Sequence, residues 1–328
     1  MDVRYTAGTT AAVAAALVMA ATLPGRTAGP LTPWGDPDLQ GVWTSEPELG
    51  VPFERPPVFG NRLELTEDEF RQRENQAALQ RAADTSDFEL ESADTSRAGA
   101  VGSATSPPPH WLERGAPSRR TSLVIAPANG RIPPTTAEAK ARPRPRGVST
   151  NQNAVGPFDS WLDMGLYDRC ITRGVPNAIF PAIYNANTRI VQSPGFVAIT
   201  YEMIHETRLI PVGDGPASGA THRQAAGQAR GHWEGDTLVV ETSNFSAENT
   251  FRGSSGALRL VERFTRVANA TLRYEVTVND PTTWTAPWTA ALNLAPQTSD
   301  MFEYACHEGN FAMRNILSAA RAAEREGR

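Results

Sequence analysis

The sequence has few of the residues from which metal centres and nucleophilic active sites are built, with two cysteines and five histidines among 328 residues. It contains no GxSxG, P-loop, GxGxxG or HExxH motif, which excludes the common signatures of serine hydrolases, nucleotide-binding proteins and zinc proteases. Its net charge is −5 and its basic residues are scattered, so it has no basic patch for nucleic acid. We therefore predict no cofactor, no metal and no nucleic-acid partner.

Long apolar runs are also missing, apart from one run near the N-terminus. Residues 11–23 form this run of 13 residues, which follows Arg4 and precedes small residues at Ala28 and Gly29. It is too short to span a bilayer, which needs about 20 residues, and it is typical of a secretory signal peptide. A buried alanine-rich helix is the alternative. The pattern predicts a signal peptide over residues 1–29 and a periplasmic or secreted protein with no membrane span after cleavage.

Export changes the interpretation of the two cysteines, Cys170 and Cys306. In an oxidising compartment two lone cysteines usually pair, and a catalytic thiol would have to stay free. We therefore predict a Cys170–Cys306 disulfide bond on the basis of the compartment.

For residues 30–150, the sequence predicts an extended N-terminal wrap with one helix and a disordered insert. The segment 30–57 is rich in Pro, Gly and Trp, and proline supplies no ladder donors. A helix is expected to begin at Thr66, because Thr66 and Glu69 form a capping box. The stretch 85–117 is rich in Ser, Ala, Gly and Pro without an apolar period, which is typical of a loop or a mobile segment.

Residues 151–328 contain short β-branched and aromatic segments typical of strands, without crossover helices. The clearest hairpin joins residues 258–267 to residues 271–278, and the second segment alternates strictly between apolar and polar residues. Residues 301–307 are expected to add a last strand before a C-terminal helix. The fold class is mainly β, an antiparallel meander forming a barrel-like (lipocalin-like) or strongly curved sheet, with the N-terminal wrap and the C-terminal helix.

Polar residues within apolar strand sequence are the candidates for chemistry. His205 lies close to Glu202, and His307 lies beside Glu308. A histidine near a carboxylate can act as a general acid or base near neutral pH, so we predict these four as the catalytic residues. Two alternatives stay open, namely surface positions at a strand end or helix start, and zinc ligation, for which the short ligand spacing is missing.

Four further residues are predicted to bind substrate. The disulfide would bring Arg169 beside the final polar cluster, where it could hold an anionic group. Arg208 lies in the same polar segment as the first histidine. Trp284 and Trp288 stand close together between two strands and could stack on a sugar ring or a flat ligand, although packing at the mouth of a barrel is the alternative.

Glu262 shares a strand face with Leu260 and Phe264. An ionised carboxylate on an apolar face is costly unless it is paired. Glu262 is therefore expected to meet an arginine or to line a polar cavity.

Several segments together resemble a large family of exported bacterial proteins of unassigned function: TPWGDPDLQGVW, RTSLVIAPANGRIPP, RCITRG, EMIHETRLIP, GHWEGDTLVVETSNF, ERFTRV, LRYEVTVNDPTTWTAPWTA and EYACHEGN. The similarity covers most of the chain after the signal peptide, apart from the 85–117 insert. It implies a single exported domain and transfers no catalytic residue.

Two functions are compatible with these residues. The first is an exported acid/base enzyme, a hydrolase or lyase, acting on a carbohydrate or other small organic molecule in the barrel cavity. The second is a non-catalytic periplasmic protein that binds such a ligand. For the enzyme, we expect His205 and His307 to open into one cavity within about 10 Å of each other.

Overall fold

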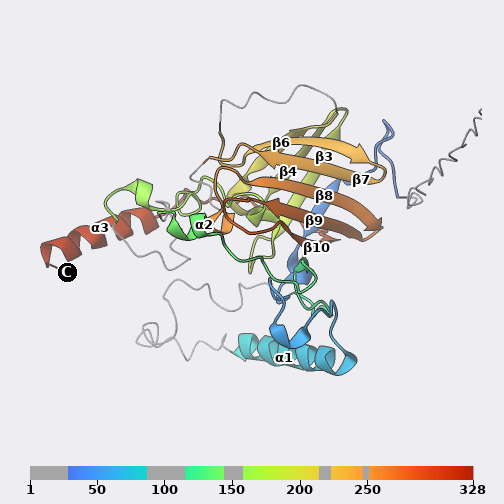
Figure 1. Ribbon diagram of the computed structural model, residues 1–328, viewed down its shortest axis with the longest axis horizontal. Coiled ribbons are helices and arrows are strands. Elements are labelled where there is room, and N and C mark those ends of the chain that lie inside the picture. The colour runs from blue at the N-terminus through green and yellow to red at the C-terminus, as the bar shows by residue number, and fades with distance from the viewer. Residues whose placement is uncertain (1–28, 87–114, 144–157, 214–222, 247–250, 328) are drawn as a thin grey trace, which may run out of the picture.

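Figure 1 shows the computed structural model of the chain, which describes residues 29–86, 115–143, 158–213, 223–246 and 251–327. Residues 1–28 of the expected signal peptide and most of the expected 85–117 insert lie outside these ranges. The described residues form a barrel-shaped sheet with helices at its periphery. Helix α1 (Glu67–Ser86) lies below the barrel in this view, α2 (Ala137–Ala141) is short, and α3 (Ala312–Arg325) extends away from the sheet.

Ten strands make up the sheet in the described part of the chain. They are β1 (Gly41–Thr44), β2 (Val124–Ala126), β3 (Asn187–Ser193), β4 (Phe196–Tyr201), β5 (Thr207–Pro211), β6 (Gln228–Glu234), β7 (Thr237–Ser243), β8 (Arg259–Ala268), β9 (Thr271–Asn279) and β10 (Trp288–Pro296). Their order is β5-β4-β3-β1-β10-β9-β8-β7-β6, with β2 added beside β10. All of these pairings are antiparallel, so the expected meander and barrel-like sheet are confirmed.

The two ends of this order, β5 and β6, meet and nearly close the barrel. A single parallel bridge joins Val212 to Gly231, and the amide of Gly213 donates to the carbonyl of Gly231 at 2.9 Å. A Cβ at position 231 would lie 3.2 Å from Val212 and 3.4 Å from Ile210. Glycine therefore permits the close approach of the two strands at the seam.

The barrel is filled by the inward side chains of its strands. In β9 the residues Leu272, Tyr274, Val276 and Val278 are fully buried, and Arg273 lies on the outer face with Glu275 at 2.8 Å. The alternation expected from the sequence of this strand is thus confirmed. A fully buried Val, Leu or Phe side chain contributes about 1.5–3 kcal/mol, so this interior is the main source of stability.

The N-terminal segment contributes one short strand to the sheet. Residues 41–44 form β1, which pairs with both β3 and β10 and joins the two halves of the strand order. Its residues can join the ladder because the prolines of this segment lie outside positions 41–44. The helix expected at Thr66 is confirmed, with the Glu69 carboxylate accepting from the Thr66 amide at 2.8 Å.

The strand expected at residues 301–307 is wrong, because these residues form irregular backbone and a turn. The backbone of this segment forms one local hydrogen bond and one hydrogen bond to a side chain. The Cys306 amide donates to the carbonyl of Tyr304 at 2.6 Å, and the Phe302 amide donates to the carboxylate of Glu202 at 3.1 Å. The C-terminal helix is confirmed as α3. No helix in the described part of the chain is long and apolar enough to cross a bilayer.

Candidate functional site

A hydrogen-bonded ion pair lies in the middle of the barrel interior. Arg208 in β5 donates through Nη1 and Nη2 to the two carboxylate oxygens of Glu262 in β8, at 3.0 and 2.7 Å. Tyr201, Tyr274 and Thr242 complete the network, with distances of 2.9–3.2 Å to one or both of the charged groups. Glu262 is 0% exposed and Arg208 is 5% exposed. The expectation that Glu262 meets an arginine is therefore confirmed.

The electrostatics of this network favour its present protonation state. Burial opposes the charge of Arg208, but the Glu262 carboxylate overcomes this effect and raises the pKa of Arg208 well above its usual value. Burial also raises the pKa of Tyr201 to about 12 and that of Tyr274 well above its usual value. Arg208 was predicted to bind substrate, yet its guanidinium is fully engaged inside the barrel. Its contacts favour a structural role.

The tryptophan pair is buried, which corrects the expectation of ring faces free to stack on a ligand. Trp284 is 4% exposed and Trp288 is 1% exposed, and their rings meet edge to face at 5.7 Å. Phe53 and Phe251 also pack on Trp288, at 5.9 and 6.0 Å. Aromatic rings in such edge contacts stabilise one another, and the cluster fills the region where β10 begins.

The predicted disulfide is confirmed. Cys170 and Cys306 are bonded, with their Cα atoms 5.7 Å apart and a separation of 136 positions in the sequence. The bond ties the segment before β3 to the segment after β10. Asn310 strengthens the connection, since its side-chain amide donates to the carbonyl of Asp168 at 3.1 Å and contacts Cys170 Sγ at 3.2 Å.

The predicted catalytic residues occupy different environments around this disulfide. Glu202 is 3% exposed, and its carboxylate accepts from Asn187 at 2.7 Å as well as from the Phe302 amide. His205 is exposed, and its Nδ1 lies 3.2 Å from the carbonyl of Tyr304. His307 and Glu308 are exposed in the turn that follows. The structure therefore brings His205 to the segment that carries His307, while Glu202 holds that segment in place.

Arg169 also lies near the disulfide, as expected from its position in the sequence. Its guanidinium carbon lies 4.5 Å from the centre of the Trp161 ring, in a cation–π contact. It is half-buried, and the contact holds it against the loop that precedes the disulfide.

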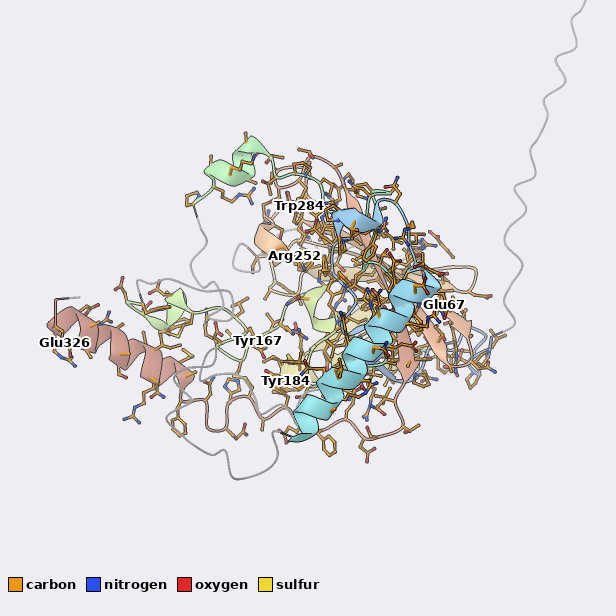
Figure 2. The ribbon with its side chains drawn as sticks, turned by 90° about the horizontal axis from the view of Figure 1, so that it is seen from below. Glu67, Tyr167, Tyr184, Arg252, Trp284 and Glu326 are labelled. Carbon is orange, nitrogen blue, oxygen red and sulfur yellow. A yellow bond between two sulfur atoms is a disulfide. The ribbon has the colours of Figure 1, made fainter. Side chains whose placement is uncertain are left out.

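Three tyrosines from separate segments converge beside the disulfide. The hydroxyl of Tyr167 lies 3.3 Å from that of Tyr184 and 3.4 Å from that of Tyr304. The rings of Tyr184 and Tyr304 are parallel, with centroids 6.5 Å apart. Figure 2 shows Tyr167 and Tyr184 close together on the side of the barrel from which α3 extends. These tyrosines were not among the predicted site residues.

Arg173 completes this group, which we call the tyrosine site: Tyr167, Tyr184, Tyr304 and Arg173. Its Nη1 atom is buried and has no hydrogen-bond partner among the described residues. Burial lowers the pKa of Arg173, and the three tyrosines oppose that shift. Burial, reinforced by neighbouring hydroxyls, raises the pKa of Tyr167 well above its usual value, and burial also raises the pKa of Tyr304. At neutral pH Tyr167 and Tyr304 therefore stay protonated.

The backbone around the tyrosine site adopts unusual conformations. Cys170, Asn185, Ile204 and His205 have positive φ angles of 57°, 52°, 66° and 48°. The left-handed region is costly for residues other than glycine, most of all for a β-branched residue such as Ile204. Strained residues of this kind cluster at ligand-binding and active sites.

An apolar floor adjoins the tyrosine site. Ala182, Met203 and Ile204 are buried and pack with the three tyrosines and Cys306 as a cluster separate from the barrel core. Apolar surface with a few placed polar groups is the usual composition of a small-molecule site. In the described part of the chain, no group of three or more His, Cys, Asp or Glu side chains is placed to hold a metal ion.

The sequence does carry a signal for this site. Tyr167 precedes Cys170 by three residues, and Tyr304 precedes Cys306 by two. A disulfide between the cysteines therefore predicts that the two tyrosines are neighbours. Comparisons with family models, curated proteins and solved structures found no match.

Proposed function

We propose that the protein is an exported, non-catalytic binding protein for a small organic molecule, and that the tyrosine site contacts the ligand. The observation that carries this proposal is the convergence of three half-buried tyrosine hydroxyls from separate segments on a guanidinium with an unused donor. The N-terminal apolar run and the disulfide support export.

The contents of the barrel favour the tyrosine site over an internal cavity. The central positions are filled by the Arg208–Glu262 network and by side chains of the main core, nearly all of them less than 5% exposed. A ligand in that position would have to displace a buried ion pair, whose disruption costs several kcal/mol. The half-buried tyrosine hydroxyls can be reached without such a change.

The protonation states favour binding over base catalysis. A general base works best with a pKa near the operating pH. The pKa values of Tyr167 and Tyr304 are raised, so both hydroxyls stay protonated and act as hydrogen-bond donors and acceptors. Glu202 accepts one hydrogen bond from Asn187 and one from the Phe302 amide, and the second fixes the 302–306 segment, which makes Glu202 a positioning residue in this proposal.

The proposal is tested by screening the purified protein against sugars, organic acids and neutral aromatic compounds by ligand-observed NMR. For a compound that binds, Tyr167→Phe and Tyr304→Phe are each expected to weaken affinity about 10-fold, the equivalent of one hydrogen bond. The matched controls are Tyr201→Phe and Tyr274→Phe, which remove hydroxyls inside the barrel and should leave affinity unchanged.

The enzyme hypothesis gives a different outcome in the same screen. A binding protein retains its affinity in His205→Ala and His307→Ala variants and leaves the compound chemically unchanged. Consumption of a compound by the wild type, with loss of turnover in either histidine variant, would replace the binding proposal with acid/base catalysis.

A further inference from the structure

We infer that the ligand of the tyrosine site carries a carboxylate, bound by Arg173 and the tyrosine hydroxyls. This inference rests on the proposed function and specifies its ligand. The starting observation is the buried Nη1 atom of Arg173, which lacks a hydrogen-bond partner among the described residues. A buried donor without a partner destabilises the folded state, and more so when it is charged.

Two other buried or half-buried arginines in the described chain are paired with carboxylates, whereas the buried Arg55 bonds to the neutral oxygens of Thr121 and Ala128. Arg208 pairs with Glu262 at 2.7 Å, and Arg120 pairs with Glu48 at 3.0 Å. The side chains that raise the pKa of Arg173 are instead the three tyrosines, against the lowering effect of burial. Among the described residues, no carboxylate acts on the guanidinium of Arg173, and a bound anion would supply the missing negative charge.

The tyrosine hydroxyls are placed to share such an anion. Their separations of 3.3 and 3.4 Å are longer than the usual 2.5–3.0 Å of an O–H···O bond, so they are only weakly bonded to one another. A carboxylate oxygen accepts several hydrogen bonds, and an arginine fork binds a carboxylate in the same plane. Binding of a carboxylate would therefore replace the weak contacts between hydroxyls with charge-assisted hydrogen bonds.

The surroundings indicate an organic anion rather than an inorganic one. Ala182, Met203 and Ile204 form the apolar floor, and the parallel rings of Tyr184 and Tyr304 add aromatic surface. A hydrated ion such as phosphate gains nothing from these side chains. A carboxylic acid with a short aliphatic or aromatic body buries its apolar part against them.

The inference is tested by isothermal titration calorimetry with two matched pairs, benzoate with benzamide and butyrate with butyramide, and with inorganic phosphate. We expect at least one carboxylate to bind at least 10-fold more tightly than its amide. Arg173→Met should remove this preference and leave binding of the amide unchanged. The matched control is Arg169→Gln, in the same loop but stacked on Trp161, which should keep the preference.

A second measurement separates ligand binding from a structural role of Arg173. An unpaired buried cation destabilises the folded state, so Arg173→Met should raise the urea midpoint in the absence of ligand. A lowered midpoint would show that Arg173 serves the fold and would overturn the inference.

The outcomes also distinguish this inference from the proposed function. If an acid and its amide bind equally tightly and Tyr304→Phe still weakens the binding, the inference of a carboxylate ligand is wrong. The proposal that the tyrosine site binds a small molecule is then retained. Binding of phosphate in preference to both carboxylates likewise overturns the ligand class. If no compound of either screen binds, both proposals fail.

Discussion

The ion pair inside the barrel gives the sharpest test of the structure. Arg208→Met leaves the Glu262 carboxylate buried with hydroxyl partners alone, and Glu262→Leu leaves the Arg208 guanidinium in the same condition. Breaking a buried pair by removing one partner costs about 3–5 kcal/mol, because an uncompensated charge stays in the interior. Since small proteins are stable by only about 5–15 kcal/mol, each single variant should lose a large part of its stability.

The double variant Arg208→Met/Glu262→Leu behaves differently, because it removes both charges. Its remaining cost comes from the hydroxyls of Tyr201, Tyr274 and Thr242, which lose their charged partners, but replacing a buried ion pair by apolar side chains is itself often neutral or stabilising. We expect its cost to be no larger than that of either single variant. Independent sites would instead add up to roughly 6–10 kcal/mol, twice the cost of one broken pair.

The assay is urea unfolding followed by the fluorescence of the tryptophans, of which the chain has seven. The matched control is Arg263→Met, which follows Glu262 in β8 and forms an exposed pair with Glu234 at 2.8 Å. A surface pair of this kind contributes less than about 1 kcal/mol. The buried network would be refuted if the single variants lost no more unfolding free energy than this control. It would also be refuted if the double variant lost the sum of the two single losses.

Two further predictions concern the disulfide and the alkaline limit of stability. Replacing Cys170 and Cys306 by serine should lower the free energy of unfolding by roughly 4–5 kcal/mol in the chain-entropy model, given the 136-residue separation. A loss below about 1 kcal/mol in urea would contradict this. The pKa of Tyr201 is raised from 10.0 in the unfolded chain to about 12, so its contribution is complete below pH 10 and is lost as the pH rises to 12. Across this window Tyr201 should contribute a fall of roughly 1.4 kcal/mol per pH unit to the unfolding free energy, in addition to the other tyrosines with raised pKa values, so the fall should be less steep in Tyr201→Phe by about this amount. Equal slopes in both proteins would show that Tyr201 is not buried.

The strands with a local signal could be predicted from the sequence. The β8–β9 hairpin follows from strict alternation, which places one face of each strand in the barrel interior. The same alternation placed Glu262 among apolar residues and required a partner for it. The identity of that partner, Arg208, could not be predicted, because β5 and β8 are not neighbours in the sheet and meet only across the closed barrel.

Strand β1 had no comparable signal. It is four residues long and pairs with strands more than a hundred residues away in the chain. The 301–307 segment shows the opposite error, because its β-prone residues are held in irregular backbone by the disulfide and by Glu202. In both cases tertiary contacts overrode the local preference.

The tyrosine site was missed for a related reason, since each of its residues is unremarkable in its own segment. Tyr167 and Arg173 precede β3, Tyr184 lies just before that strand, and Tyr304 follows β10. Histidines and carboxylates are the residues whose sequence pattern indicates acid/base chemistry, whereas the groups that converge here are three tyrosines and an arginine.

The tyrosine site is assembled by the pairing of β1 with its two neighbouring strands. Its residues come from the segments that enter β3 and leave β10, and β1 lies between these two strands in the sheet. Pairing of β1 with both strands therefore brings the two segments together, and the disulfide then holds them. The chain completes the site when β1 has paired with both β3 and β10, so a ligand bound as proposed above should stabilise this folded arrangement by mass action.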